Sequence, residues 1–265
     1  MSLACVPGMG LAVPLPSGMG ALEANRSPGA EDEFLAGLLR GHRFRFCGDA
    51  GSAADAIAIR RRVYVQGNGY DVPVPDAYDA RSWHILAEDV ELGTPCGSMR
   101  LTPRDAGPVE AEEYFQLPAA LRQPGTVEIS RFAILPAYRK SRTFLPVVSL
   151  GMFTLVRQML DRIGVRRMVI CSKPERLWTF EWLRFRRTGL RAGYDKLGGA
   201  EHELLCCEVR EAAPTLADHP FRPFLEGRDF AEVERPAQVP ALGLFGACET
   251  PDDRFTADGD AAAVA

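Results

Sequence analysis

The amino-acid sequence predicts an α/β fold in which a mixed central sheet is flanked by helices on both faces. Along the middle of the chain, segments with the two-residue alternation of strands take turns with segments of helical periodicity. Some neighbouring strands have no helix between them, so the sheet is expected to be mixed rather than wholly parallel. The composition agrees with a soluble globular protein, since 46% of the 265 residues are hydrophobic and 25% are charged.

Each element is predicted from its own residue pattern. Residues 42–47 alternate Arg with Phe, as in a half-buried strand. Ser52 with Asp55 resembles a capping box, and it opens a helix that places Arg60 and Tyr64 on one face. The other predicted elements are a helix at 34–39, strands at 83–88, 96–102, 127–134, 167–171 and 204–209, a buried helix at 144–163, and a helix from Pro174 that ends at Gly189 and Gly193.

The segment from Val127 to Ile134 begins as a strand and then breaks its own alternation. Glu128 and Ser130 share one face of this strand, whereas Arg131 falls on the opposite, apolar face. A β-bulge after Ser130 would let both charged side chains reach one cleft and would free a backbone N–H group. A buried structural ion pair is the alternative, because paired charges perturb pKa values in either setting.

The two ends of the chain differ in composition from the middle. Residues 1–30 are rich in Gly, Pro, Ala and Met without periodicity, which predicts a weakly ordered segment. Residues 31–211 form the predicted domain. Residues 212–265 form a Pro- and Ala-rich acidic tail, predicted to be partly docked or disordered. Four of its apolar residues suit a short docked segment: Phe221, Phe224, Leu225 and Phe230.

Several classes of protein are excluded by the sequence. No apolar run reaches the roughly 18 to 20 residues that span a bilayer, and no basic segment precedes an apolar core at the N-terminus. We therefore expect a cytoplasmic protein without a transmembrane segment. The seven cysteines show no C-x-x-C spacing and only four histidines are present, so neither disulfides nor a metal site are predicted. No nucleic-acid-binding signature accompanies the arginines.

An ordered series of residues resembles the motif series of a known family. The series consists of Arg60, Tyr64, Tyr70, Asp76, Asp79, Arg100, Phe115, Glu128 and Arg131. It is similar to that of the acyl-homoserine-lactone synthases and their relatives, the long-chain N-acyl amino acid synthases and exosortase-associated acyltransferases. The match covers about residues 44–142. The resemblance implies a GNAT-type acyltransferase fold for residues 31–211, in which the first six residues of the series bind the substrate.

Two aromatic positions bear on the branch of this superfamily. The lactone synthases typically place Phe and Trp where this chain has Tyr64 and Tyr70. The resemblance therefore favours an N-acyl amino acid synthase, which moves a fatty acyl group to the α-amine of an amino acid. The first alternative is a lactone autoinducer synthase of quorum sensing that uses S-adenosylmethionine. The second is a non-catalytic module that binds acyl carriers.

The stretch after the broken strand bears on the acyl donor. Members that use acetyl-CoA usually carry a glycine-rich loop that holds the pyrophosphate at a helix N-terminus. The stretch from Arg139 to Phe144 has no glycine. The resemblance thus favours an acyl-phosphopantetheine arm on acyl carrier protein over acyl-CoA, with no permanently bound cofactor. Arg139, Lys140 and Arg142 would contact the acidic carrier, and a solvated basic face is the alternative.

Attack of a free amine on an acyl thioester is the expected reaction. Glu128, directly or through water, is the candidate general base, because an α-amino group must lose a proton to become nucleophilic. Backbone N–H groups at the bulge after Ser130 would stabilise the oxyanion. Glu128, Ser130 and Arg131 form the predicted catalytic set.

Two roles remain open for the other charged residues. Arg100 and Arg131 suit a bidentate clamp on the carboxylate of the amino acid, or they hold Glu128 and the Asp pair in place. Asp76 and Asp79 either attract the ammonium group of the substrate or order their loop by pairing with Arg60.

An acyl chain requires an apolar pocket. The candidates are Phe115, Phe132, Phe144, Val148, Met152 and Trp178, and for each of them a place in the ordinary core is the alternative.

Overall fold

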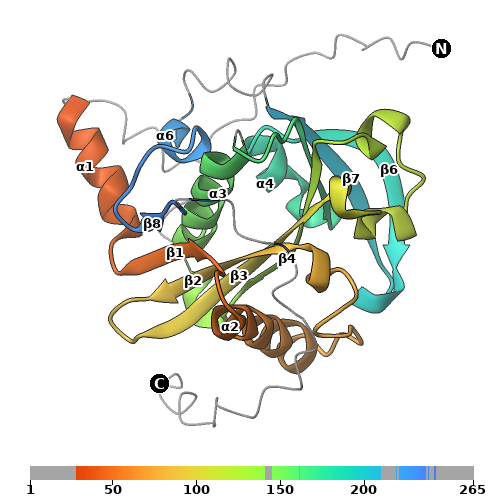
Figure 1. The fold of residues 1–265 in the computed structure, drawn as a ribbon, viewed down its shortest axis with the longest axis horizontal. Coiled ribbons are helices and arrows are strands. Elements are labelled where there is room, and N and C mark those ends of the chain that lie inside the picture. Colours follow the sequence, from red (N-terminus) through yellow and green to blue (C-terminus); the bar gives the residue numbers. More distant parts are fainter. Residues whose placement is uncertain are drawn as a thin grey trace. The chain divides into compact units, whose positions relative to one another are not determined.

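The computed structural model describes residues 28–140, 145–160, 162–209, 219, 221–236, 238 and 242 (Figure 1). The chain divides into two compact units, Met1–Leu38 and Leu39–Ala265. Helix α1 (Pro28–Leu39), up to Leu38, is the part of the first unit that the structure describes. It begins at Pro28, earlier than the helix predicted at 34–39. All elements described below belong to the second unit.

The second unit is built on one eight-stranded sheet with the strand order β6-β7-β5-β4-β3-β2-β1-β8. Strands β1 to β4 pair antiparallel in sequence order, whereas β4 pairs parallel with β5 and β8 pairs parallel with β1. The sheet is therefore mixed, which confirms the prediction. The strands are β1 (His42–Phe46), β2 (Trp83–Asp89), β3 (Thr94–Pro103), β4 (Thr126–Ile134), β5 (Arg167–Ser172), β6 (Arg186–Tyr194), β7 (Ala200–Glu208) and β8 (Val233–Glu234).

Two long helices cover opposite faces of the sheet (Figure 1). Helix α2 (Ala50–Arg60) packs against Ala133 of β4, whereas α3 (Val147–Leu160) packs against Gly97 of β3 and Phe44 of β1. We call these two sides of the sheet the α2 face and the α3 face. This arrangement confirms the predicted fold class. The shorter helices are α4 (Leu177–Trp182) and α6 (Arg222–Leu225).

Helix α2 begins at a capping box and ends in a wider coil. The N–H group of Ser52 donates to Asp49 Oδ1 at 2.8 Å, and the N–H group of Asp49 donates to Ser52 Oγ at 3.4 Å. Asp49 is therefore the N-cap, and Ser52 is the third residue of the helix rather than its cap. After Arg60 the chain continues as a π-helix (Arg61–Gly67), a form that often marks functional sites.

Strand β4 contains the bulge that its broken alternation predicts. Ser98 of β3 pairs with Ala133, but Arg100 pairs with Ser130, so β4 has one extra residue between these pairs. Arg131 has a φ of 51°, in the left-handed region that residues other than glycine rarely adopt. Because of this local turn, the guanidinium groups of Arg131 and Arg100 reach the same carboxylates on the α2 face.

The parallel pairing of β4 with β5 ends inside both strands. The last pair is Ile129 with Ile170, although β4 continues to Ile134 and β5 to Ser172. The sheet therefore opens between these two strands directly after Ile129. The bulge at Arg131 lies beside this opening.

The segment after α4 is a strand, and the prediction of a long helix there was wrong. Helix α4 ends at Trp182, and the residues that were expected to continue it up to Gly189 pair with β7 instead. Arg184 has a φ of 69°, which no right-handed helix accommodates. Its neighbours Leu183 and Phe185 are both buried. The run of apolar residues therefore extends beyond the end of α4 because these side chains fill the core. It does not mark a longer helix.

The described part of the C-terminal segment packs on helix α3 and on the edge of the sheet. Phe221, Phe224 and Leu225 are buried around α6, and Phe230 stacks on Phe224 with ring centroids 4.8 Å apart. Strand β8 then extends the edge of the sheet at β1. The domain boundaries at residues 31 and 211 stay predictions. None of the helices that the structure describes is long and apolar enough to cross a membrane.

Candidate active site

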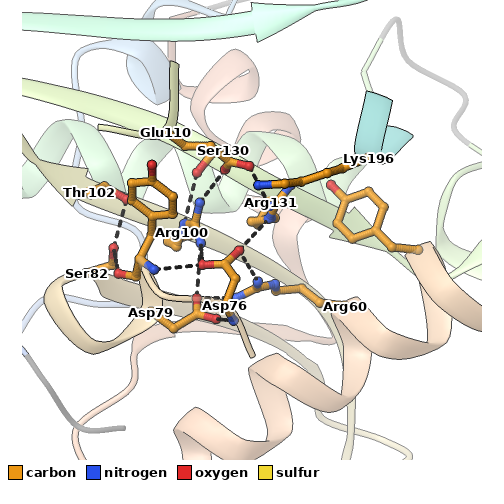
Figure 2. A network of polar contacts seen from close by, with 12 residues as sticks. Arg60, Asp76, Asp79, Ser82, Arg100, Thr102, Glu110, Ser130, Arg131 and Lys196 are labelled. Carbon is orange, nitrogen blue, oxygen red and sulfur yellow. Dashed lines mark hydrogen bonds and ion pairs between the residues drawn. The ribbon is translucent and has the colours of Figure 1, made fainter. Parts of the chain in front are cut away.

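A network of buried charged side chains lies on the α2 face, beside the bulge of β4 (Figure 2). Its members come from α2, from the loop and turn before β2, from β3, from the 3-10 turn at residues 110–113 and from β4. Each side chain is at most 6% exposed, so water cannot replace a missing partner. The network consists of Arg60, Arg100, Arg131, Asp76, Asp79 and Glu110.

Arg100 is the centre of this network. Its Nη1 donates to Asp76 Oδ1 at 2.5 Å and to Asp79 Oδ1 at 3.3 Å. Its Nη2 donates to Glu110 Oε2 at 2.6 Å, and its Nε donates to Ser130 Oγ at 3.1 Å. All three guanidinium nitrogens are therefore bonded to protein groups, and the side chain is fully buried.

The other two arginines surround the same carboxylates. Arg131 Nε donates to Asp76 Oδ2 at 3.0 Å and Nη2 to Glu110 Oε1 at 2.5 Å. Arg60 donates to Asp79 Oδ1 at 2.5 Å and to Asp76 Oδ2 at 3.3 Å. Burial of Asp76 opposes ionisation, but the three guanidinium groups outweigh it and lower the pKa of Asp76 to about 2. Asp76 thus stays ionised at neutral pH.

Glu128 lies beside the network, and no cation among the described residues is within ion-pair distance of it. Its Oε2 accepts the backbone N–H of Glu110 at 2.8 Å, and its Oε1 accepts that of Ala111 at 3.1 Å. Burial and the charge of Glu110 raise the pKa of Glu128 to about 7, against the opposing effects of Arg100 and the two N–H groups. A carboxyl group with such a pKa exchanges protons readily near neutral pH.

Glu110 is a member of the network that was not predicted from the sequence. It occupies the turn between β3 and β4 and bonds to both Arg100 and Arg131. The charges of the predicted series do not indicate a missing carboxylate, because Glu128 and the two aspartates already balance its three arginines. The weak signal in the sequence is an acidic residue between two apolar neighbours, Val109 and Ala111. Both neighbours are fully buried in the structure.

A chain of aromatic contacts crosses the opening between β4 and β5. The hydroxyl of Tyr64 donates to the carbonyl oxygen of Phe132, within the bulge, at 2.9 Å. The ring of Tyr70 stacks on that of Tyr64 with centroids 6.2 Å apart. Lys173, which directly follows β5, donates from Nζ to the hydroxyl of Tyr70 at 3.0 Å. No local pattern in the sequence distinguishes Lys173.

The acyl-pocket candidates do not gather in one place. Phe132 lies near Phe153 of α3, with ring centroids 6.1 Å apart, and Val148 and Met152 are buried on the α3 face. Phe115 instead packs in a separate apolar cluster with Val109, Val169 and Tyr194. Trp178 is 42% exposed, and Phe144 lies outside the described residues.

An open recess on the α3 face is lined in part by Phe153. The cavity itself measures about 20 Å³, room for about one water molecule, and the space around it is open to solvent. Its lining is mostly apolar and includes Phe153, Val156 and Met168, with Arg157 and Arg184 at its wall.

Only some of the basic side chains predicted near the carrier-protein contact are exposed and without an acidic partner among the described residues. Arg139 and Lys140 are exposed, while Arg142 lies outside the described residues. Other arginines that follow in the sequence are neutralised within the sheet: Arg187 and Arg191 pair with Glu203, and Arg167 pairs with Glu208. Within the described ranges, no group of three or more His, Cys, Asp or Glu side chains could hold a metal ion.

Three comparisons relate this chain to known proteins. The family model "N-acyl amino acid synthase FeeM" matches residues 55–208. No curated protein matches the sequence. Among solved structures, the N-acyl amino acid synthase FeeM from uncultured soil microbes is similar at 16% identity and a TM-score of 0.55, over 65% of this chain and 94% of that chain.

Two lactone synthases share the fold. The CoA-dependent acyl-homoserine lactone synthase BjaI is 18% identical with a TM-score of 0.55, over 77% of this chain and 97% of that one. The AHL synthase LasI is 19% identical with a TM-score of 0.50, over 63% and 89%. These likenesses establish the GNAT-like architecture alone. The family match, in contrast, spans more than half of the 265 residues and includes every charged member of the network. The chain belongs to the N-acyl amino acid synthase FeeM family and is an acyltransferase, not a non-catalytic module.

Proposed function

We propose that this enzyme transfers a fatty acyl group from an acyl carrier protein thioester to the α-amine of an amino acid. The observation that carries the proposal is the bulge of β4 at Arg131, which lies next to Glu128 where β4 and β5 stop pairing. An opening between two strands suits an extended thioester arm, and a bulge supplies backbone N–H groups for an oxyanion.

Glu128 serves as the general base of this reaction. The amine nitrogen attacks the thioester carbon, and its proton passes to Glu128 directly or through water. The tetrahedral oxygen gains negative charge beside the bulge, and the carbon–sulfur bond then breaks, so that the donor leaves as a thiol after it takes up a proton. The raised pKa of Glu128 and its position beside the bulge support this role.

The arginines hold the site in shape rather than bind the substrate. The nitrogens of Arg100 all donate to protein acceptors, which leaves none for a carboxylate of the amino acid. Asp76 and Asp79 likewise pair with Arg60, and so they order the loop before β2. Of the two roles that the sequence leaves open, the geometry supports the positioning role for all of them.

Acyl carrier protein is the proposed donor. The exposed Arg139 and Lys140, just after β4, offer positive charge to an acidic carrier. Acyl-CoA is the competing donor, since BjaI and others with this fold are CoA-dependent. Phe132, Val148 and Met152, on the side that α3 covers, are proposed to contact the acyl chain.

Product analysis tests the proposal. The purified protein is incubated with an acyl carrier protein thioester or the matching acyl-CoA, together with a mixture of amino acids or S-adenosylmethionine, and the products are identified by mass spectrometry. We expect N-acyl amino acids, formed faster from the carrier protein. Acyl lactones from S-adenosylmethionine would replace the proposal with the autoinducer alternative, and a faster reaction with acyl-CoA would correct the donor.

A further inference from the structure

The cation Lys173 differs from every cation of the buried network. Its ammonium group donates to the neutral hydroxyl of Tyr70 at 3.0 Å and lies 5.4 Å from the centroid of the same ring. Within the described part of the chain, no carboxylate lies within ion-pair distance of it. An ammonium group has three donors, so the bond to Tyr70 leaves capacity for an anion.

The network cannot supply the cation that an amino acid acceptor needs. Arg100 and Arg131 each contact two or more carboxylates of the protein and are almost fully buried. A substrate carboxylate that approached them would compete with Asp76 and Glu110. Lys173 is half-buried and at the edge of the opening, so an incoming carboxylate reaches it without breaking an ion pair.

The position of Lys173 relative to the bulge suits this role. Lys173 directly follows the end of β5, and Phe132 belongs to β4. The two residues therefore come from the two strands that border the opening. Between them, the rings of Tyr70 and Tyr64 are stacked, and Tyr64 is bonded to the Phe132 carbonyl. The aromatic pair thus holds the ammonium group in a fixed place with respect to the bulge.

We propose that Lys173 binds the carboxylate of the acceptor amino acid and that Tyr70 positions its ammonium group. This inference rests on the proposed function. It adds that the enzyme selects acceptors with a free carboxylate, because amides, esters and simple amines cannot form the charge-assisted bond. No bond is made or broken at Lys173.

Steady-state kinetics with three acceptors test the inference: an amino acid that the wild-type enzyme acylates, its carboxamide and its decarboxylated amine. Charge-assisted hydrogen bonds contribute enough to change KM by about 10- to 100-fold. We expect Lys173→Met to raise KM for the amino acid by this factor and to leave KM for the amide and the amine unchanged. Lys173→Arg should restore much of the preference, and Tyr70→Phe should weaken it less than Lys173→Met.

Arg176→Met is the matched control, because Arg176 is exposed in the turn that follows Lys173. It removes the same charge nearby and should leave all three KM values unchanged. Calorimetric titration of the amino acid into each folded variant gives a second readout without turnover. An unchanged preference in Lys173→Met, or an equal loss in Arg176→Met, would overturn the inference while the proposed function stands. A wild-type enzyme that forms no N-acyl amino acid would overturn both.

Discussion

The α2 face and the α3 face of this sheet are held together in different ways. On the α3 face, backbone and rings approach very closely: a Cβ atom on Gly97 would lie 2.7 Å from Val148, and one on Gly151 would lie 2.3 Å from the ring of Phe44. On the α2 face, six charged side chains occupy the corresponding layer and bond to one another. The α2 face also has apolar contacts, between α2 and the sheet, but of the two faces it is the one that adds a network of buried ion pairs to them.

The difference shows where the sequence is constrained by shape and where by chemistry. Apolar packing accepts substitutions that conserve volume, usually at a cost below about 1.5 kcal/mol. A buried ion network has no such freedom, because removing one member leaves its partners charged and without water. The enzyme therefore keeps its catalytic candidates on the face that tolerates the least change.

The largest effect is expected on activity, from Glu128→Gln. Loss of a general base lowers kcat/KM by about 100- to 10,000-fold, while circular dichroism should show a folded protein. Because the pKa of Glu128 is raised to about 7, the wild-type rate should increase with pH through this value as the group loses its proton. The variant should lack this step and retain only the later rise from the amine itself. Full activity in Glu128→Gln would show that Glu128 is not the general base and has only a structural role.

The next effect concerns stability. Arg100→Met leaves Asp76 and Glu110 short of a partner, and it should lower the free energy of unfolding by about 3 to 5 kcal/mol in urea denaturation. Met152→Leu on the α3 face is the control, with an expected loss below about 1.5 kcal/mol. Equal losses for the two variants would show that the faces do not differ as described.

A smaller effect is expected on the α3 face, from Gly151→Ala. The added methyl group would overlap the ring of Phe44, at a cost of about 1 to 3 kcal/mol in unfolding free energy. Gly48→Ala, where a Cβ meets no atom within 4 Å, should change stability by no more than about 0.5 kcal/mol. Adding Phe44→Leu to Gly151→Ala should recover part of the loss. No recovery would mean that helix α3, not the ring, resists the methyl group.

The smallest effect is expected at the boundary between the faces. Tyr64→Phe removes one hydrogen bond to the carbonyl of Phe132 and should lower the unfolding free energy by about 0.5 to 1.5 kcal/mol. Thermal and urea denaturation measure this change. A loss above about 3 kcal/mol, as large as that expected for a member of the ion network, would show that Tyr64 contributes more than one hydrogen bond.

The bulge of β4 was predictable from the sequence because its cause is local. Glu128, Ser130 and Arg131 break a two-residue period within four positions, and no distant contact is needed to detect it. The mixed sheet was predictable from the order of the elements, because strands that follow one another without a helix between them usually pair antiparallel.

Glu110 and Lys173 were missed because their roles depend on distant partners. Glu110 meets Arg131, which is 21 residues away, and Lys173 meets Tyr70, which is 103 residues away. Neither position stands out in its local pattern. Strand β6 was missed for a related reason, since it exists through pairing with β7 and carries glycines and arginines instead of a clear alternation.

The pairing of β8 with β1 has a consequence for how the protein is made. Phe44 pairs with Val233 and Arg45 with Glu234, so the edge of the sheet is closed by residues that leave the ribosome long after β1. Until then β1 offers an unpaired edge to other chains. Shortening the protein before Val233 should therefore reduce the soluble yield from cells more than it reduces the turnover of the molecules that do fold.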